Sequence, residues 1–172
     1  MENLKGLKKN VVFYLLFMFL YQISYLDFKY GIYQFCTSFL FMILSLIFLY
    51  KSLKFFKNAE LVKYFYYYAI FSIFYLVSGV VILSFEIFHT FALFLIFVLL
   101  FAYLFLYKIY SNLSKISGIL HFKIWAIFYI FIPIPFLFLS IFFIFLIFIP
   151  RTILVLYLIF AWSKLFKTKL QI

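Results

Sequence analysis

Hydrophobic residues along this chain form long runs, and short segments that carry the charges separate them. A helix needs about 20 apolar residues to cross the hydrocarbon core of a bilayer, and most of these runs reach that length. Inside lipid the backbone must satisfy its own hydrogen bonds, as a helix does, and the alternating polarity of a membrane β-barrel is absent. The pattern predicts an all-α, polytopic helical membrane protein with about six transmembrane helices. The predicted spans are 11–26, 30–50, 64–85, 87–107, 124–149 and 152–168.

The composition supports lipid rather than water as the solvent of this fold. Of the 172 residues, 70% are hydrophobic and 11% are charged, and the mean hydropathy is +1.26. A soluble domain has about 45–50% apolar and about 25% charged residues. We therefore expect one integral membrane domain that occupies residues 1–172.

Two features of the composition receive a plain explanation. The chain has 31 Phe, 16 Tyr and fourteen Lys against the single Arg151, which we attribute to AT-rich codons rather than to an aromatic ligand site. Cys36 stands alone and cannot form an intrachain disulfide. The first hydrophobic run has no small-residue cleavage site, so it is interpreted as an uncleaved first span.

The distribution of cations predicts the orientation in the membrane. The net charge is +11, and 13 of the 15 cations lie in the two tails and in the 51–63 and 108–123 connections. Since short cytoplasmic loops carry the Lys and Arg excess, both ends are predicted to be cytoplasmic, in a multi-pass protein of the cell membrane. Trp125 and Trp162 agree, because each lies two residues from a lysine of this side. These cations beside apolar runs indicate contact with anionic headgroups and no nucleic-acid partner.

The last two spans are the hardest to divide. If Pro150-Arg151-Thr152 forms the last outer turn, the fifth span is long and the sixth is short. Pro133 and Pro135 would kink the fifth helix, while Lys164 and Lys167 would snorkel and so lengthen the sixth. A turn nearer Ser140 is the alternative, but it leaves Arg151 inside the membrane at a cost of several kcal/mol unless it is paired. We expect the turn at 150–152.

The connection after the fourth span has amphipathic character. Hydrophobic residues recur there at helical spacing, which predicts a short helix lying on the inner leaflet. It would serve as a lipid-contacting connector or, alternatively, as a docking surface for a soluble partner. The residues of this stripe are Ile109, Leu113, Ile116 and Leu120.

One outer turn combines residue types that bind metals. Glu86 and His89 have the i, i+3 spacing that places a carboxylate and an imidazole on one helical face, and Asp27 would add a third ligand from the first outer turn. The alternative is a polar turn among headgroups. A haem between His89 and His121 is excluded, because the predicted topology places them at opposite ends of the fourth span, about 30 Å apart.

Uncharged polar residues mark one face of each of the first three spans. We interpret these faces as helix–helix contacts, since small and hydroxyl residues allow close approach and share hydrogen bonds. A path for a small solute is the alternative. The residues concerned are Gln22, Gln34, Thr37, Ser72 and Tyr75.

The sequence contains no motif that supplies an activity. Nucleophile elbows, zinc-protease helices, Walker loops and C-x-x-C pairs are all absent, no cofactor is indicated, and no stretch matches a family signature. We therefore expect a non-catalytic subunit or accessory protein of a membrane complex, with the lipid bilayer, other membrane proteins or further copies of itself as partners. One alternative is a small transporter or channel component, and the other is an outer-face enzyme that uses Glu86 and His89.

Overall fold

The computed structural model describes residues 2–24, 31–84, 88–131 and 148–169 of the chain. These residues form six helices and no strand, so the all-α prediction is confirmed. The helices are α1 (Glu2–Ser24), α2 (Gly31–Lys54), α3 (Ala59–Ser84), α4 (Phe88–Ser117), α5 (His121–Phe131) and α7 (Phe148–Lys169).

Three of these helices could cross a membrane. By length and apolar composition the candidate spans in the described residues are Phe35–Lys54 of α2, Ala59–Ser78 of α3 and Phe94–Ser117 of α4. Bulky apolar side chains remain exposed on them, as on the other helices. Such surfaces favour contact with lipid, and the composition and the three candidate spans are typical of a membrane protein.

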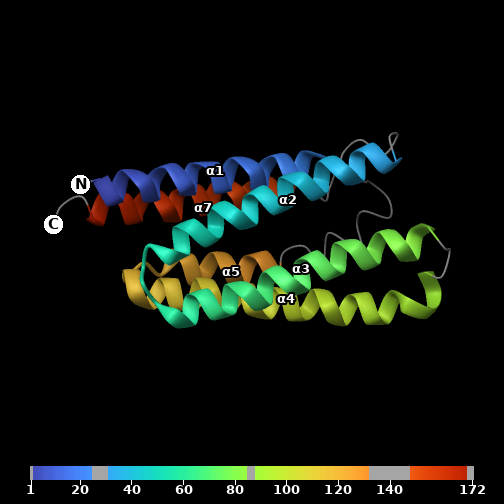
Figure 1. Ribbon diagram of the computed structural model, residues 1–172. Coiled ribbons are helices and arrows are strands. Elements are labelled where there is room, and N and C mark those ends of the chain that lie inside the picture. Colours follow the sequence, from blue (N-terminus) through green and yellow to red (C-terminus); the bar gives the residue numbers. More distant parts are fainter. Residues whose placement is uncertain (1, 25–30, 85–87, 132–147, 170–172) are drawn as a thin grey trace.

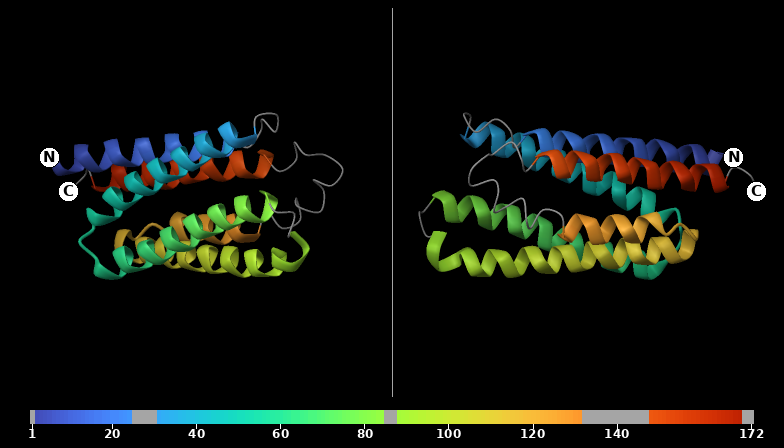
Figure 2. Two further views of the ribbon diagram at one scale, coloured as in Figure 1. Left: turned by 45° about the vertical axis from the view of Figure 1, so that its right-hand side comes forward. Right: turned by 180° about the vertical axis from the view of Figure 1, so that it is seen from behind.

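The six helices are arranged in two layers that close into a ring. One layer holds α1, α2 and α7, and the other holds α3, α4 and α5 (Figure 1, Figure 2). Each helix packs against its neighbour in the chain order given above, and α7 packs against α1. Consecutive helices run in opposite directions, so the start of α1, the end of α7 and the connections 55–58 and 118–120 gather at one end of the bundle, which we call the terminal end (Figure 1).

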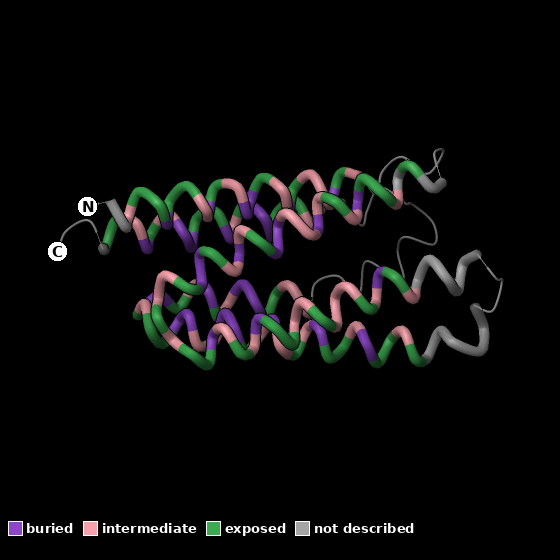
Figure 3. Tube along the Cα trace, viewed as in Figure 1, coloured by how far each residue is buried: buried purple, intermediate pink, exposed green. Residues whose placement is uncertain are grey.

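The core lies between the two layers and is built from large side chains. Buried positions turn toward the inside of the ring, while exposed positions cover its outside (Figure 3). Four aromatic side chains that are almost completely buried dominate the half nearer the terminal end: Tyr110, Phe122, Trp125 and Trp162. Since lipid tails are as apolar as leucine, close packing and internal hydrogen bonds hold such helices together.

Local sequence explains the two connections at the terminal end. Asn58 precedes α3, and its side-chain oxygen accepts a hydrogen bond of 3.0 Å from the Leu61 amide, which is an N-cap. Lys57 has φ 49° and Gly118 has φ 74°, so a left-handed residue follows the end of α2 and of α4. Both connections are therefore short and well defined.

The predicted outer turn at Pro150-Arg151-Thr152 is wrong. All three residues belong to α7, which begins at Phe148. Proline is tolerated in the first turn of a helix, because the amide it lacks has no intrahelical partner there. The sixth helix therefore has 22 residues, about 33 Å of length, although it is not among the three candidate spans found in the described residues. The fifth span cannot extend to 149, and Pro133, Pro135 and Ser140 lie outside the described residues.

The predicted short helix on the inner leaflet is also wrong. Residues 109–117 continue α4 without a break. Ile109 and Leu113 are completely buried in the core, so the apolar stripe packs against the bundle rather than on headgroups. Ile116 and Leu120 remain exposed.

Candidate functional site

The centre of the bundle contains a hydrogen bond between two tyrosines from opposite layers. The hydroxyls of Tyr14 on α1 and Tyr110 on α4 lie 2.8 Å apart, and both side chains are buried. Each hydroxyl has a donor and an acceptor capacity to satisfy. A buried hydroxyl without a partner costs about 1–3 kcal/mol, so this pair ties α1 to α4 at one register.

Tilted and edge-to-face contacts between aromatic rings extend this contact along the core. The Tyr110 ring lies 4.5 Å from the ring of Trp125 on α5, measured between centroids. Trp125 in turn lies 4.8 Å from Tyr129, and Tyr129 meets Tyr103 of α4 edge to face at 5.6 Å. We call these five residues the aromatic ladder: Tyr14, Tyr110, Trp125, Tyr129 and Tyr103.

Polar groups of the aromatic ladder also interact with α7. The Trp125 indole nitrogen donates a hydrogen bond of 2.7 Å to the Leu154 carbonyl of α7. Arg151, half-buried in the first turn of α7, lies within electrostatic range of the Tyr103 hydroxyl. The ladder thus connects α1, α4, α5 and α7 through the interior.

One buried polar atom next to the aromatic ladder lacks a hydrogen-bond partner among the described residues. The indole nitrogen of Trp162 on α7 has no hydrogen-bond partner among the described residues, although it lies beside the Tyr110 hydroxyl. An N–H group in this position is close to a partner but outside bonding geometry, and it contributes less to stability than the bonded indole of Trp125.

The polar residues predicted to mark helix faces occupy different environments. Gln22 of α1 is buried, whereas Ser72 and Tyr75 of α3 are half-buried, with Ser72 beside the Tyr68 hydroxyl. Thr37 of α2 is exposed, and its hydroxyl donates to the Tyr33 carbonyl of its own helix at 2.9 Å. Gln34 lies in α2, but its side chain is outside the described part of the structure.

The buried polar side of α2 is instead a stripe of serines at seven-residue spacing. Ser38, Ser45 and Ser52 are buried, and the Ser38 hydroxyl lies 2.7 Å from that of Ser24 on α1. Small hydroxyl residues let two helices approach closely. The seven-residue spacing was visible in the sequence and could have identified this face.

The predicted metal ligands are only partly placed. Asp27 and Glu86 lie outside the described residues, and His89 lies in the first turn of α4 without a described side chain. Within the described residues no three His, Cys, Asp or Glu side chains come together. The metal site therefore stays a prediction.

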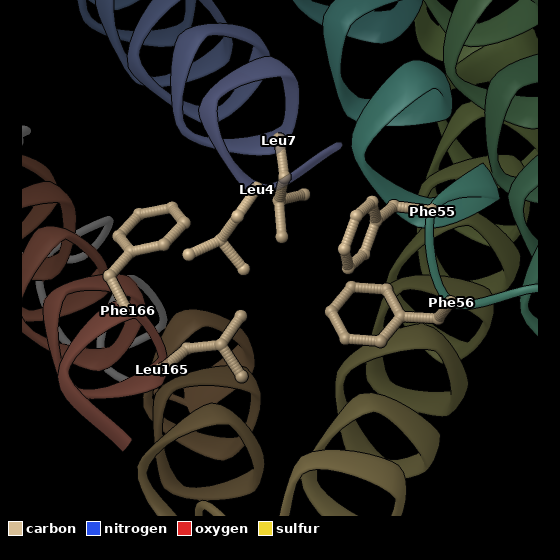
Figure 4. A pocket seen from close by; sticks show the side chains of 6 residues that line it. All are labelled: Leu4, Leu7, Phe55, Phe56, Leu165 and Phe166. Atoms are coloured by element: carbon tan, nitrogen blue, oxygen red, sulfur yellow. The ribbon is translucent and has the colours of Figure 1, made fainter. Parts of the chain in front are cut away.

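A small apolar pocket opens at the terminal end. It is a shallow depression with no room for an enclosed water molecule, and it lies where the two ends of the chain and the α2–α3 connection meet (Figure 4). Its lining offers no polar group for recognition or catalysis. The lining residues are Leu4, Leu7, Phe55, Phe56, Leu165 and Phe166.

Comparison with protein-family models, with curated proteins and with solved structures finds no match to this chain. A functional proposal for this chain therefore rests on its sequence and structure alone. In the described residues the core offers hydroxyls and indoles that hold helices in register, and its one half-buried cation is Arg151.

Proposed function

We propose that this chain is a six-span protein of the cell membrane, with both ends in the cytoplasm, and that it acts as a non-catalytic subunit or accessory protein of a membrane complex. The observation that carries the proposal is the filled core of aromatic rings, set against a surface of exposed apolar side chains. Such a molecule interacts through its outside. Among the most exposed of these side chains are Phe97, Phe131 and Leu156.

The gathering of lysines supports the proposed orientation. The first turns of α1, the last turns of α2, α4 and α7 and the connections between them meet at the terminal end (Figure 1). These segments carry Lys5, Lys8, Lys9, Lys51, Lys54, Lys57, Lys108, Lys115, Lys164 and Lys167. A cytoplasmic location of this end satisfies the positive-inside rule.

Cysteine labelling tests the topology. Lys57→Cys and Ser117→Cys, each in a Cys36→Ser background, place a thiol beside the two connections of the terminal end. Both are expected to react with a membrane-impermeant maleimide in inside-out vesicles and not in intact cells. Labelling of either thiol in intact cells would contradict the orientation.

Purification tests the role. The full chain, tagged and extracted from native membranes in mild detergent, is expected to bring a membrane protein with it in a fixed ratio measurable by quantitative mass spectrometry. A chain that purifies alone, as a monomer or as copies of itself, would contradict the subunit role.

The same purification distinguishes the subunit from the outer-face enzyme. Glu86→Ala and His89→Ala are expected to leave the complex and its activity unchanged. Loss of activity together with stoichiometric bound metal would favour the outer-face enzyme.

A transporter component is the second candidate. The observation in its favour is the polar side of α3 in the interior, where Ser72 lies beside Tyr68 and Tyr75 lies within range of Tyr103. Ser72→Leu would abolish flux of the solute at normal expression if this side conducts, and Gln34→Leu tests the polar face predicted for α2 in the same way. Unchanged flux in both variants would exclude a path along these faces.

A further inference from the structure

A polar cluster joins α5 and α7 on the outside of the bundle, near the terminal end. The first residue of α5 is His121, whose Nδ1 lies 2.7 Å from the Tyr157 hydroxyl of α7. Its Nε2 lies 3.0 Å from the Lys164 ammonium nitrogen of the same helix. Lys164 is exposed, while His121 and Tyr157 are half-buried. We call these three residues the histidine cluster.

The chemistry of lysine fixes the direction of both hydrogen bonds. An ammonium group only donates, so Nε2 of His121 must be the acceptor. The imidazole is then neutral and carries its proton on Nδ1, which donates to the Tyr157 oxygen. The Tyr157 O–H and the remaining Lys164 N–H groups are left as donors.

No acidic side chain that the structure describes neutralises this cluster. The one acidic side chain described is Glu60 at the start of α3, whose carboxylate accepts a hydrogen bond from Asn112 of α4 at 3.4 Å. Lys167, which is exposed and follows Lys164 by three residues, lies on the same side of α7 and adds a second positive charge. An anion is the complementary ligand for this combination of donors and positive charge.

Apolar side chains continue from the cluster toward the middle of the two helices. Lys164 lies over the Phe160 ring at 4.9 Å, and the Tyr157 ring lies 6.4 Å from that of Phe128 on α5. Phe128, Leu156 and Phe160 are all exposed. Donors at one end and an apolar surface directly below them match a phosphate headgroup and its acyl chain.

We propose that the histidine cluster binds the phosphate of an anionic phospholipid of the cytoplasmic leaflet, with an acyl chain along Phe128, Leu156 and Phe160. Basic sites between membrane helices on the cytoplasmic side bind such headgroups in other proteins. The apolar surface argues for a lipid over free phosphate. This inference rests on the proposed membrane insertion and orientation.

Native mass spectrometry of the full chain in detergent tests the site. The protein is mixed with phosphatidylglycerol and phosphatidylcholine of the same acyl chains at equal concentration, and the ratio of the two bound lipids is measured. The wild type is expected to prefer phosphatidylglycerol, and Lys164→Gln to lower that ratio about fivefold, as expected for one cation near a headgroup. Tyr157→Phe, which keeps the ring and removes one donor, is expected to lower it less.

Lys115→Gln is the matched control, since it removes the same charge from an exposed lysine at the end of α4. Equal binding of the two lipids to the wild type, or an equal loss in Lys115→Gln and Lys164→Gln, would overturn the proposal. Displacement of phosphatidylglycerol by millimolar inorganic phosphate would also overturn it, in favour of a soluble anion. Should Lys164→Gln fail to fold, Tyr157→Phe against Tyr33→Phe supplies the same comparison.

Carbonate extraction of membranes tests the proposed membrane insertion separately from the proposed lipid site. A chain released by carbonate would contradict the membrane insertion itself. A chain retained in the membrane that shows no lipid preference would contradict the lipid site alone.

Discussion

At the scale of single residues, the Tyr14–Tyr110 hydrogen bond is the contact most open to measurement. Each of Tyr14→Phe and Tyr110→Phe leaves the other hydroxyl buried without its partner, and the double variant removes both groups. We expect each single variant to lower the free energy of unfolding by about 1–2 kcal/mol and the double variant to cost little more than one of them. Unfolding by SDS titration in mixed micelles measures all three.

A coupling energy near zero between the two positions would contradict the shared bond. The control is Tyr33→Phe, because Tyr33 is strongly exposed on α2 and its hydroxyl is expected to contribute nothing measurable.

The sequence did not single out these tyrosines, and the reason is physical. Ninety-six residues separate Tyr14 from Tyr110, and nothing local marks two hydroxyls as partners across two layers. The abundance of aromatic residues further concealed the ladder. The spacing of Trp125 and Tyr129 by four residues, and of Tyr103 and Tyr110 by seven, was the one signal available.

At the scale of elements, the cap of α3 is the clearest local determinant. Asn58→Ala removes the acceptor for the Leu61 amide and is expected to lower the free energy of unfolding by about 1 kcal/mol. Asn58→Asp retains a capping oxygen and is the matched control. Equal destabilisation by the two substitutions in the same SDS titration would show that the cap is not what matters there.

The face of α7 gives a second prediction. Leu156 is 61% exposed, whereas Leu158 is completely buried. Nitroxide labels at Leu156→Cys and Leu158→Cys, each in a Cys36→Ser background, are expected to differ in collision with dissolved oxygen, with the label at 156 the more accessible because lipid surrounds it. Similar accessibility at both positions would contradict the packing of α7.

Element boundaries show where sequence reasoning worked and where it failed. Each described helix overlaps one of the predicted apolar runs, as expected because lipid-exposed backbone requires helical hydrogen bonding; that each run crosses the membrane stays a prediction. The turn at 150–152 was predicted from one proline, Pro150, and one charged residue, Arg151. Proline fits the first turn of a helix as well as it fits a turn, and hydrophobicity alone cannot separate the two. The short inner-leaflet helix predicted from the amphipathic stripe at 109–120 was wrong for a related reason. A helix face that packs on protein and one that lies on lipid show the same period of hydrophobic residues.

At the scale of the whole molecule, closure of the ring depends on α7. The Trp125 indole is hydrogen-bonded to α7, whereas the Trp162 indole has no such bond among the described residues. Trp125→Phe loses this bond as well as volume, and we expect it to cost about 1 kcal/mol more than Trp162→Phe. Thermal unfolding of the purified variants, followed by near-UV circular dichroism, compares them directly.

An equal or larger loss in Trp162→Phe would contradict the role assigned to the Trp125–Leu154 bond. The comparison is well matched, because both indoles are almost completely buried in the same core.

The packing of the last helix against the first has a consequence for how the protein is made. A ribosome releases α1 before α7, and domains assemble in the order in which they emerge. The side of α1 that receives α7 therefore stays in contact with lipid, or with an insertion factor, until α7 has been made. The ring cannot close before then, and a transcript cut short before residue 148 yields a bundle that is open along one entire side.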